Sequence, residues 1–177
     1  MESLGRQLRG AVWGLPLARK VAEEICGDKV RIRALLRELF GEDVEVRKRA
    51  ADVSRRITER DGRLLESYAD ELAGLLETLP LEESRTRWHL GLVVPRVAHT
   101  RVQRLRAAQT MSLMAGDDSN VVRCSAVEGL GLLALQEASL RDQAEEMVER
   151  YLRAGTKAMK SRARGVEKML AKCRAQD

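Results

Sequence analysis

Apolar residues recur at helical spacing along most of this chain. From Val46, apolar side chains follow at positions 50, 53 and 57, a pattern of i, i+4, i+7 and i+11. On a helix of about 3.6 residues per turn, that spacing forms one stripe. The same spacing returns three times, as Thr86, Leu90, Val93 and Val97, then Val122, Ala126, Gly129 and Leu133, then Met159, Ala163, Val166 and Leu170. The pattern predicts four amphipathic helices that pack in the same way.

Other amphipathic segments precede each of these four helices. They cover residues 29–40, 62–79, 101–115 and 138–153. Two shorter helices are expected over 3–13 and 16–27. The chain therefore reads as helix pairs stacked side by side, with the first pair as an irregular cap.

Each stripe helix also begins with a related phrase. EDVEVRKRAADVS (42–54) and DDSNVVRCSAVEG (117–129) both contain Val-Arg followed by Ala at the same offset. The first stripe position is always followed by a basic residue, namely Arg47, Arg87, Arg123 or Lys160. Three residues before it stand Asp43, Glu83, Ser119 and Thr156, of which Asp43, Ser119 and Thr156 have the short side-chain oxygens of good N-caps.

The phrase Asp-x-x-Val-Arg-x-x-Ala, opening a helix in units of about forty residues, resembles HEAT-like repeats, an α-solenoid family. The resemblance covers residues 29–174, although Thr86 and Leu90 replace Val and Ala, and Lys160 replaces Arg. It implies an all-α fold, a right-handed solenoid (α-α superhelix) of antiparallel helix pairs. Residues 1–177 would form one domain, with capping helices over 1–28 and repeats over 29–61, 62–99, 100–136 and 137–174.

Composition agrees with a folded helical protein. Hydrophobic residues make up 44% and charged residues 33% of the chain, which is too much apolar surface for a disordered chain. Aromatic residues are only 3% and there are three prolines, which favours helices over a β-sandwich or barrel. No apolar run is long enough to cross a membrane, and we expect no membrane partner. Three scattered cysteines without a CxxC motif predict reduced thiols and a cytoplasmic location.

The net charge of +5 is unevenly distributed along the chain. Residues 84–116 contain no Asp or Glu, and 153–174 carry eight basic residues against one acidic residue, Glu167. The stretches 61–83 and 137–149 are acidic instead. In a HEAT-like solenoid the second helices of the pairs line the concave surface, so the resemblance places much of the basic charge there.

Helical phase indicates which side chains face that surface, because positions two, six and nine after the first stripe residue point away from the core. The projection predicts a groove with cationic ends and a less polar middle around Trp88 and Leu92. The other uncharged positions that it points toward the groove are Pro95, Cys124, Gly131, Ser161 and Gly165. Candidate partner-binding residues are Lys48, Arg55, Trp88, Leu92, Arg96, Arg164 and Lys168.

Several of these residues have two interpretations. Trp88 is either a binding anchor or, as favoured for a large aromatic residue, a filler between repeats. Through the resemblance, the repeated arginines are expected to pair with Asp43 and Asp118 in a ladder between units, whereas Arg87 and Lys160 have no Asp so placed and should be freer. The basic stretch 153–174 is either a phosphate-binding strip or a solvated helix.

Catalytic and metal-binding patterns are weak. His89 and His99 are ten residues apart without a third ligand nearby, so no metal is expected. Cys124 lies near a helix N-terminus, where a thiol pKa can fall, but a small buried thiol is the favoured interpretation. No phosphate loop, GxSxG or HExxH pattern occurs, so no enzymatic activity and no cofactor is expected.

The main functional hypothesis is a non-catalytic HEAT-like scaffold or adaptor that binds a protein or peptide on its concave face. The alternative is binding of duplex DNA or RNA along a basic concave ridge. The resemblance suggests this because one branch of HEAT-like proteins, the helical-repeat DNA glycosylases, binds duplex DNA in such a face. A third hypothesis, an accessory subunit like the HEAT-like phycobilin lyases, rests on fold analogy alone.

Overall fold

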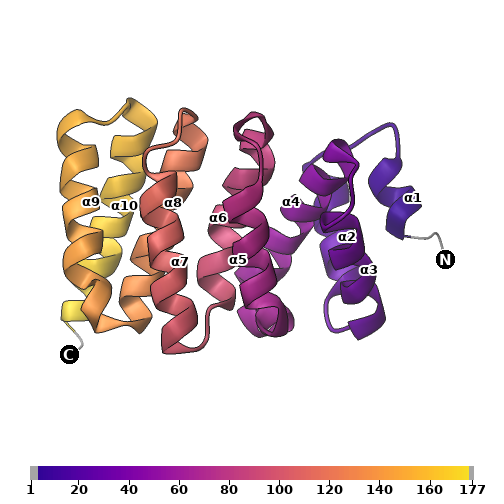
Figure 1. The fold of residues 1–177 in the computed structure, drawn as a ribbon, viewed down its shortest axis with the longest axis horizontal. Coiled ribbons are helices and arrows are strands. Elements are labelled where there is room, and N and C mark those ends of the chain that lie inside the picture. The colour runs from indigo at the N-terminus through magenta and orange to yellow at the C-terminus, as the bar shows by residue number, and fades with distance from the viewer. Residues whose placement is uncertain (1–3, 176–177) are drawn as a thin grey trace.

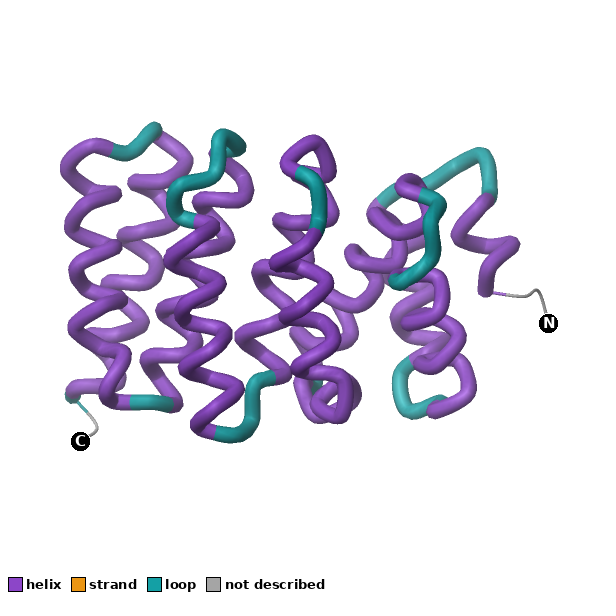
Figure 2. Tube along the Cα trace, viewed as in Figure 1, coloured by secondary structure: helices purple, strands orange, loops and turns teal. Residues whose placement is uncertain are grey.

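The computed structural model describes residues 4–175, and within that range the chain consists of helices joined by short loops, with no strand. The helices follow one another along the long axis of the molecule in chain order (Figures 1 and 2). The α-helices are α1 (Leu4–Arg9), α2 (Leu15–Ile25), α3 (Lys29–Leu39), α4 (Val44–Arg60), α5 (Ala69–Thr78), α6 (Ser84–Val97), α7 (Arg101–Met114), α8 (Asn120–Gln136), α9 (Arg141–Ala154) and α10 (Lys157–Arg174). The 3-10 segments are η1 (Gly62–Tyr68), η2 (Leu81–Glu83) and η3 (Ala138–Leu140).

The helices form two layers. Helices α4, α6, α8 and α10 pack successively on one another, and we call them the inner layer. Each also packs on the helix before it, so that α3, α5, α7 and α9 form an outer layer that faces the viewer in Figure 1. This arrangement confirms the predicted all-α fold and its order of helices. Residue 3, the first of the predicted helix over 3–13, lies outside the described residues.

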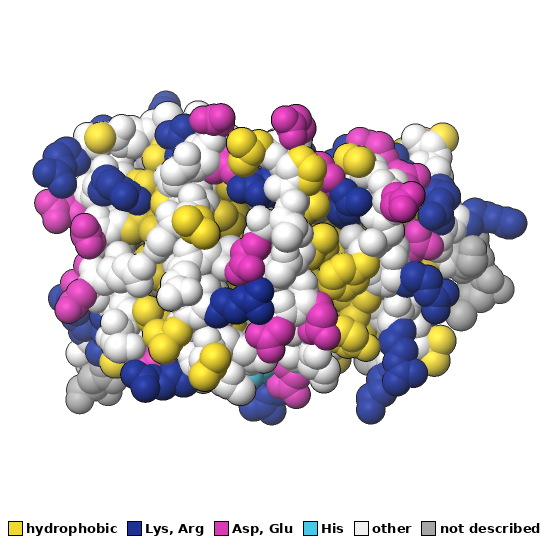
Figure 3. All heavy atoms as spheres, in the orientation of Figure 1, with side chains coloured by type: hydrophobic (Ala, Val, Ile, Leu, Met, Phe, Trp, Pro, Cys, Tyr) yellow, Lys and Arg dark blue, Asp and Glu magenta, His cyan; other side chains and the backbone are white. Residues whose placement is uncertain are grey.

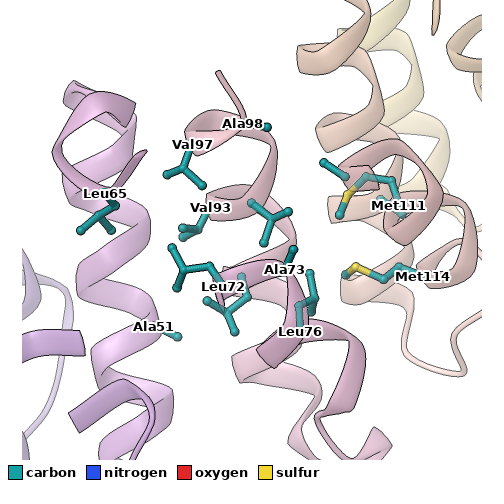
Figure 4. Close-up of a cluster of buried hydrophobic side chains, with 14 of the residues drawn as sticks. Ala51, Leu65, Leu72, Ala73, Leu76, Val93, Val97, Ala98, Met111 and Met114 are labelled. Atoms are coloured by element: carbon teal, nitrogen blue, oxygen red, sulfur yellow. The ribbon is translucent and has the colours of Figure 1, made fainter. Parts of the chain in front are cut away.

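The apolar stripes are the core, as predicted. All four residues of each stripe are buried, from Val46 in α4 to Leu170 in α10. Outer-layer side chains complete the core, and Figure 4 shows Leu72 of α5 beside Val93 of α6, with Leu76 further along α5. The hydrophobic effect at these helix-helix contacts stabilises the stack, because a stripe left exposed would keep its apolar area in water.

Helix starts follow the predicted caps in part. The carboxylate of Asp43 accepts a hydrogen bond from the backbone N–H of Val46 (3.1 Å), and the hydroxyl of Thr156 accepts one from Met159 (3.4 Å). The prediction of a side-chain cap at Ser119 is wrong, because the Ser119 side chain makes no capping hydrogen bond. The carboxylate of Asp117 instead accepts a hydrogen bond from the backbone N–H of Ser119 (2.8 Å).

Two arginines connect the beginning of one inner-layer helix to the loop before the next. The Arg47 guanidinium pairs with Glu83 and donates to the Gly41 carbonyl. The Arg87 guanidinium pairs with Asp117 at 2.7 Å and donates to the Leu79 carbonyl at 3.0 Å. Each guanidinium thereby satisfies a loop carbonyl and a carboxylate at once.

These contacts correct two expectations. Arg87 is not free, because its side chain is buried against Asp117, which itself is only 1% exposed. The expected pairing of the repeated arginines with the carboxylates of Asp43 and Asp118 is also wrong. Arg123 donates to the backbone carbonyls of Asp117 and Asp118, whereas Arg47 turns toward Glu83. The sequence does not reveal these partners because the loops that bring the carboxylates close are set by tertiary packing.

Among the described helices, none combines the length and the apolar character needed to cross a bilayer.

Candidate binding groove beside Trp88

A groove opens on the inner layer where α6, α8 and α10 meet. Its volume is about 470 Å³. We call it the Trp88 groove, and its lining is Trp88, Val121, Cys124, Ala158, Ser161, Arg162 and Gly165. Three helices that are separate in sequence thus contribute to one concave surface, because the inner layer stacks them side by side.

Trp88 forms one wall of the groove and is held in place from two sides. The side chain is half-buried and packs against the core. Its ring stacks on His89, with ring centroids 4.4 Å apart, and the Arg55 guanidinium lies 5.8 Å from the ring centroid. A stacked ring under a cation loses little further freedom on binding, as suits an interface anchor.

Three arginines near the groove, Arg55, Arg96 and Arg162, are paired with neighbouring carboxylates. Arg55 pairs with Asp52 (3.5 Å) and with Glu59. Glu128 of α8 lies between two helices, with Arg162 at 2.8 Å and Arg96 at 3.9 Å. The surface around the Trp88 groove therefore mixes both signs of charge and is not the cationic ridge that the sequence alone suggested.

The remaining candidate residues divide into buried and free ones. Leu92 is only 4% exposed, so its predicted place in an open apolar middle is wrong. Arg96 is mostly buried as well, donates to the Leu92 carbonyl (3.0 Å) and has a pKa lowered by burial. Lys48 pairs with Glu45. Arg164 and Lys168 on α10 are exposed and have no side-chain partner among the described residues.

Pro95 and Gly131 also correct the projected groove, because both are buried. A Cβ atom on Gly131 would lie 2.5 Å from the Cγ1 atom of Val166, so this position is packed against α10. The projection did place Trp88, Cys124, Ser161 and Gly165 correctly beside the groove. It missed Arg162, whose position on α10 became visible only when the neighbouring helix was placed.

Behind Trp88 lies a buried polar pair that the sequence did not predict. His89 Nδ1 is 3.9 Å from Asp52 Oδ1 and has no hydrogen-bond partner in the described structure, whereas the same Asp52 oxygen is ion-paired with Arg56 at 3.0 Å. Burial lowers the pKa of His89 to about 4; Asp52 opposes this shift, whereas Arg55, Arg56 and Arg85 add to it. The imidazole is therefore neutral at physiological pH.

The thiol of Cys124 forms part of the groove floor and is 9% exposed. Burial raises its pKa, and this outweighs the opposing influence of Arg162. A thiol of this kind is largely protonated at neutral pH and is a poor nucleophile. The favoured interpretation of a small buried thiol is confirmed.

Within residues 4–175, no group of three or more His, Cys, Asp and Glu side chains could hold a metal ion. The fold and the groove define an all-helical protein of packed helices with a concave surface on its inner layer. Comparisons of the chain with protein-family models, with curated proteins and with solved structures find no match.

Proposed function

We propose that this chain is a non-catalytic adaptor of the HEAT-like solenoid type, whose inner layer binds a protein or peptide partner at the Trp88 groove. Three features support the repeat architecture: the shared phase of the four stripes, the chain-order succession of helix pairs, and the similar contacts of Arg47 and Arg87. Stacked units bury their apolar faces only against their neighbours, which explains why the same contacts recur.

The observation that carries the binding proposal is the half-buried indole of Trp88 at an open groove, beside which Arg55 and Arg162 are already paired with carboxylates. Tryptophan is one of the residue types enriched among the energetic anchors of protein interfaces. Paired charges at a rim suit the polar and charged side chains of a peptide. A nucleic-acid backbone would instead require unpaired cations.

Gly165 offers a sharp test of this site. A Cβ atom built there meets nothing within 4 Å, so a larger side chain would extend into the groove without displacing the core. Gly165→Met places a long side chain in the groove, whereas Gly165→Ala is the matched control with a similar gain in helix propensity. Trp88→Ala removes the anchor from the opposite wall.

The experiment selects peptides on the wild-type protein from a random phage-displayed library and measures their affinity for the three variants. We expect peptides that keep their affinity for Gly165→Ala and lose at least about tenfold with Gly165→Met and with Trp88→Ala, since an anchor is worth about 2 kcal/mol. Peptides that bind all three variants equally well would show that the groove is not the docking site.

A second function, nucleic-acid binding, is favoured by one observation on α10. A row of cations on this helix has no side-chain partner among the described residues: Lys157, Lys160, Arg164, Lys168 and Lys172. Binding of a labelled DNA duplex and an RNA hairpin is measured by anisotropy at increasing salt. A steep linear fall of log affinity with log salt, removed by Arg164→Glu with Lys168→Glu, supports this function; no binding at low salt excludes it.

A further inference from the structure

A second concave surface lies on the outer layer, between α3 and the segment that contains η1 and α5. Helix α3 packs on α1, α2 and α4, whereas α5 packs on η1, α6 and α7, so a furrow separates the two outer helices. Two adjoining hollows of about 390 and 400 Å³ form it, and both are lined by Arg33 and Tyr68. We call it the outer furrow. Figure 3 shows hydrophobic side chains gathered between these helices.

The floor of the outer furrow is apolar. Ile32 and Leu36 of α3 form one side, and Leu64 and Tyr68 of η1 form the other. At the end of α3 the ring of Phe40 is 44% exposed. An exposed aromatic ring that continues an apolar floor is the usual composition of a surface that receives a partner side chain.

The rim of the outer furrow is cationic. Lys29, Arg33 and Arg37 of α3 and Arg63 of η1 lie along it, and none of them has a side-chain partner among the described residues. Two carboxylates, Glu66 and Glu71, are the only acidic lining residues in the described structure, and Glu66 lies 3.7 Å from His99. The lining of the furrow thus has four cations against two carboxylates and keeps an uncompensated positive charge.

The spacing of the α3 residues indicates the shape of the occupant. Lys29, Arg33, Leu36 and Phe40 follow one helical face, over a length of about 16 Å. A helix of about three turns lying along α3 would place its apolar face on the floor and its flanking residues at the rim, which is the helix-in-groove mode of recognition. A phosphate backbone would use the cations and leave the apolar floor in contact with water.

We propose that the outer furrow binds an acidic amphipathic helix of a partner protein. The cations attract the carboxylates on the two edges of that helix, and the apolar floor receives its leucine or phenylalanine side chains. This site is on a different layer from the Trp88 groove, and its occupation does not depend on the function proposed for that groove.

The test uses a labelled synthetic peptide with leucines at i, i+3, i+4 and i+7 and glutamates on its flanks, together with a copy in which lysine replaces every glutamate. Arg33→Glu with Arg37→Glu reverses two rim charges. The matched control is Arg19→Glu with Lys20→Glu on α2, which changes the net charge equally at exposed residues away from the furrow. Phe40→Ala shortens the apolar floor, and circular dichroism checks that each variant is folded.

We expect the acidic peptide to bind the wild-type protein and the α2 control equally and to lose about tenfold in affinity with the reversed rim, because two attractive pairs become repulsive. Phe40→Ala should cost about fivefold. Three results would overturn the proposal: no saturable binding to the wild-type protein, equal binding of the lysine peptide, or equal losses in the rim and control variants. The proposal would also be overturned if Trp88→Ala weakened peptide binding while the furrow variants did not, because the peptide would then bind in the Trp88 groove.

Discussion

Two helical glycines give opposite predictions for the same substitution. Gly129 is on α8, and a Cβ atom there would lie 2.6 Å from Met111 Sδ, 2.8 Å from Pro95 Cγ and 2.9 Å from the Gly91 carbonyl oxygen. Gly165 is on α10, and a Cβ atom there meets nothing within 4 Å. Both glycines lie in helix interiors, so both replacements by alanine gain the same intrinsic helix propensity, about 1 kcal/mol.

The difference in unfolding free energy between the two variants therefore isolates the cost of packing at Gly129. Met111 can move its sulfur, but the Pro95 ring and the Gly91 carbonyl are fixed by the backbone of α6. Overpacking of this kind costs about 1–3 kcal/mol. Gly165→Ala should thus be about 1 kcal/mol more stable than the wild-type protein, and Gly129→Ala about 2 kcal/mol less stable than Gly165→Ala.

Urea unfolding followed by circular dichroism, with thermal unfolding as a second measurement, gives both values. For a chain of this length, Gly165→Ala should raise the Tm by about 2–4 °C. If Gly129→Ala stabilised the protein as much as Gly165→Ala does, the close approach of α6 and α8 would be refuted. A change in the denaturant slope for either variant would signal loss of two-state unfolding, and the comparison would then use the Tm alone.

Three further predictions concern polar groups. The free energy of unfolding should fall by up to about 3 kcal/mol as the pH decreases from about 6.5 to 4, because His89 in the unfolded chain binds a proton that buried His89 (pKa about 4) does not. His89→Gln should make the unfolding free energy less dependent on pH over this range, and an unchanged dependence would contradict the lowered pKa of His89. Asp117→Ala should cost about 3–5 kcal/mol in urea unfolding, because Arg87 stays buried without its carboxylate, and a smaller loss is expected when Arg87→Met accompanies Asp117→Leu. Thr100→Ala should cost about 1 kcal/mol, because Thr100 and Gln103 form a capping box at α7, and an unchanged Tm would show that this cap is dispensable.

The helices and the core were predictable because they depend on local periodicity. A stripe such as Val46, Ala50, Val53 and Ile57 is written in one short segment, and all four residues are buried as the spacing predicts. The segment 62–79 was predicted as one helix but begins as the 3-10 helix η1. There a Cβ atom on Gly62 would collide with the Arg96 carbonyl, so the chain is shaped by a residue far along the sequence.

Charge pairing was less predictable because it depends on which loops approach each other. The Arg87 side chain had no suitable Asp at the expected offset in its own turn, yet Asp117 from the loop before α8 reaches it. The arginines Arg55 and Arg96 likewise looked cationic in sequence but are compensated by Asp52, Glu59 and Glu128. A count of basic residues therefore overestimates the positive potential of α4 and α6, whereas α10 and the outer furrow keep cations that have no side-chain partner among the described residues.

Helical phase alone also cannot distinguish a helix packed between two inner-layer neighbours from one with a single such neighbour in the described structure. Leu92 and Gly165 occupy the same position in their helices, six residues after the first stripe residue, yet Leu92 is buried and Gly165 opens into the Trp88 groove. Helix α6 is enclosed by α4 and α8, whereas α10 has only α8 beside it in the inner layer of the described structure. Gly165 therefore stays open to the groove, and Trp88 of α6 lines the same groove together with residues of α8 and α10.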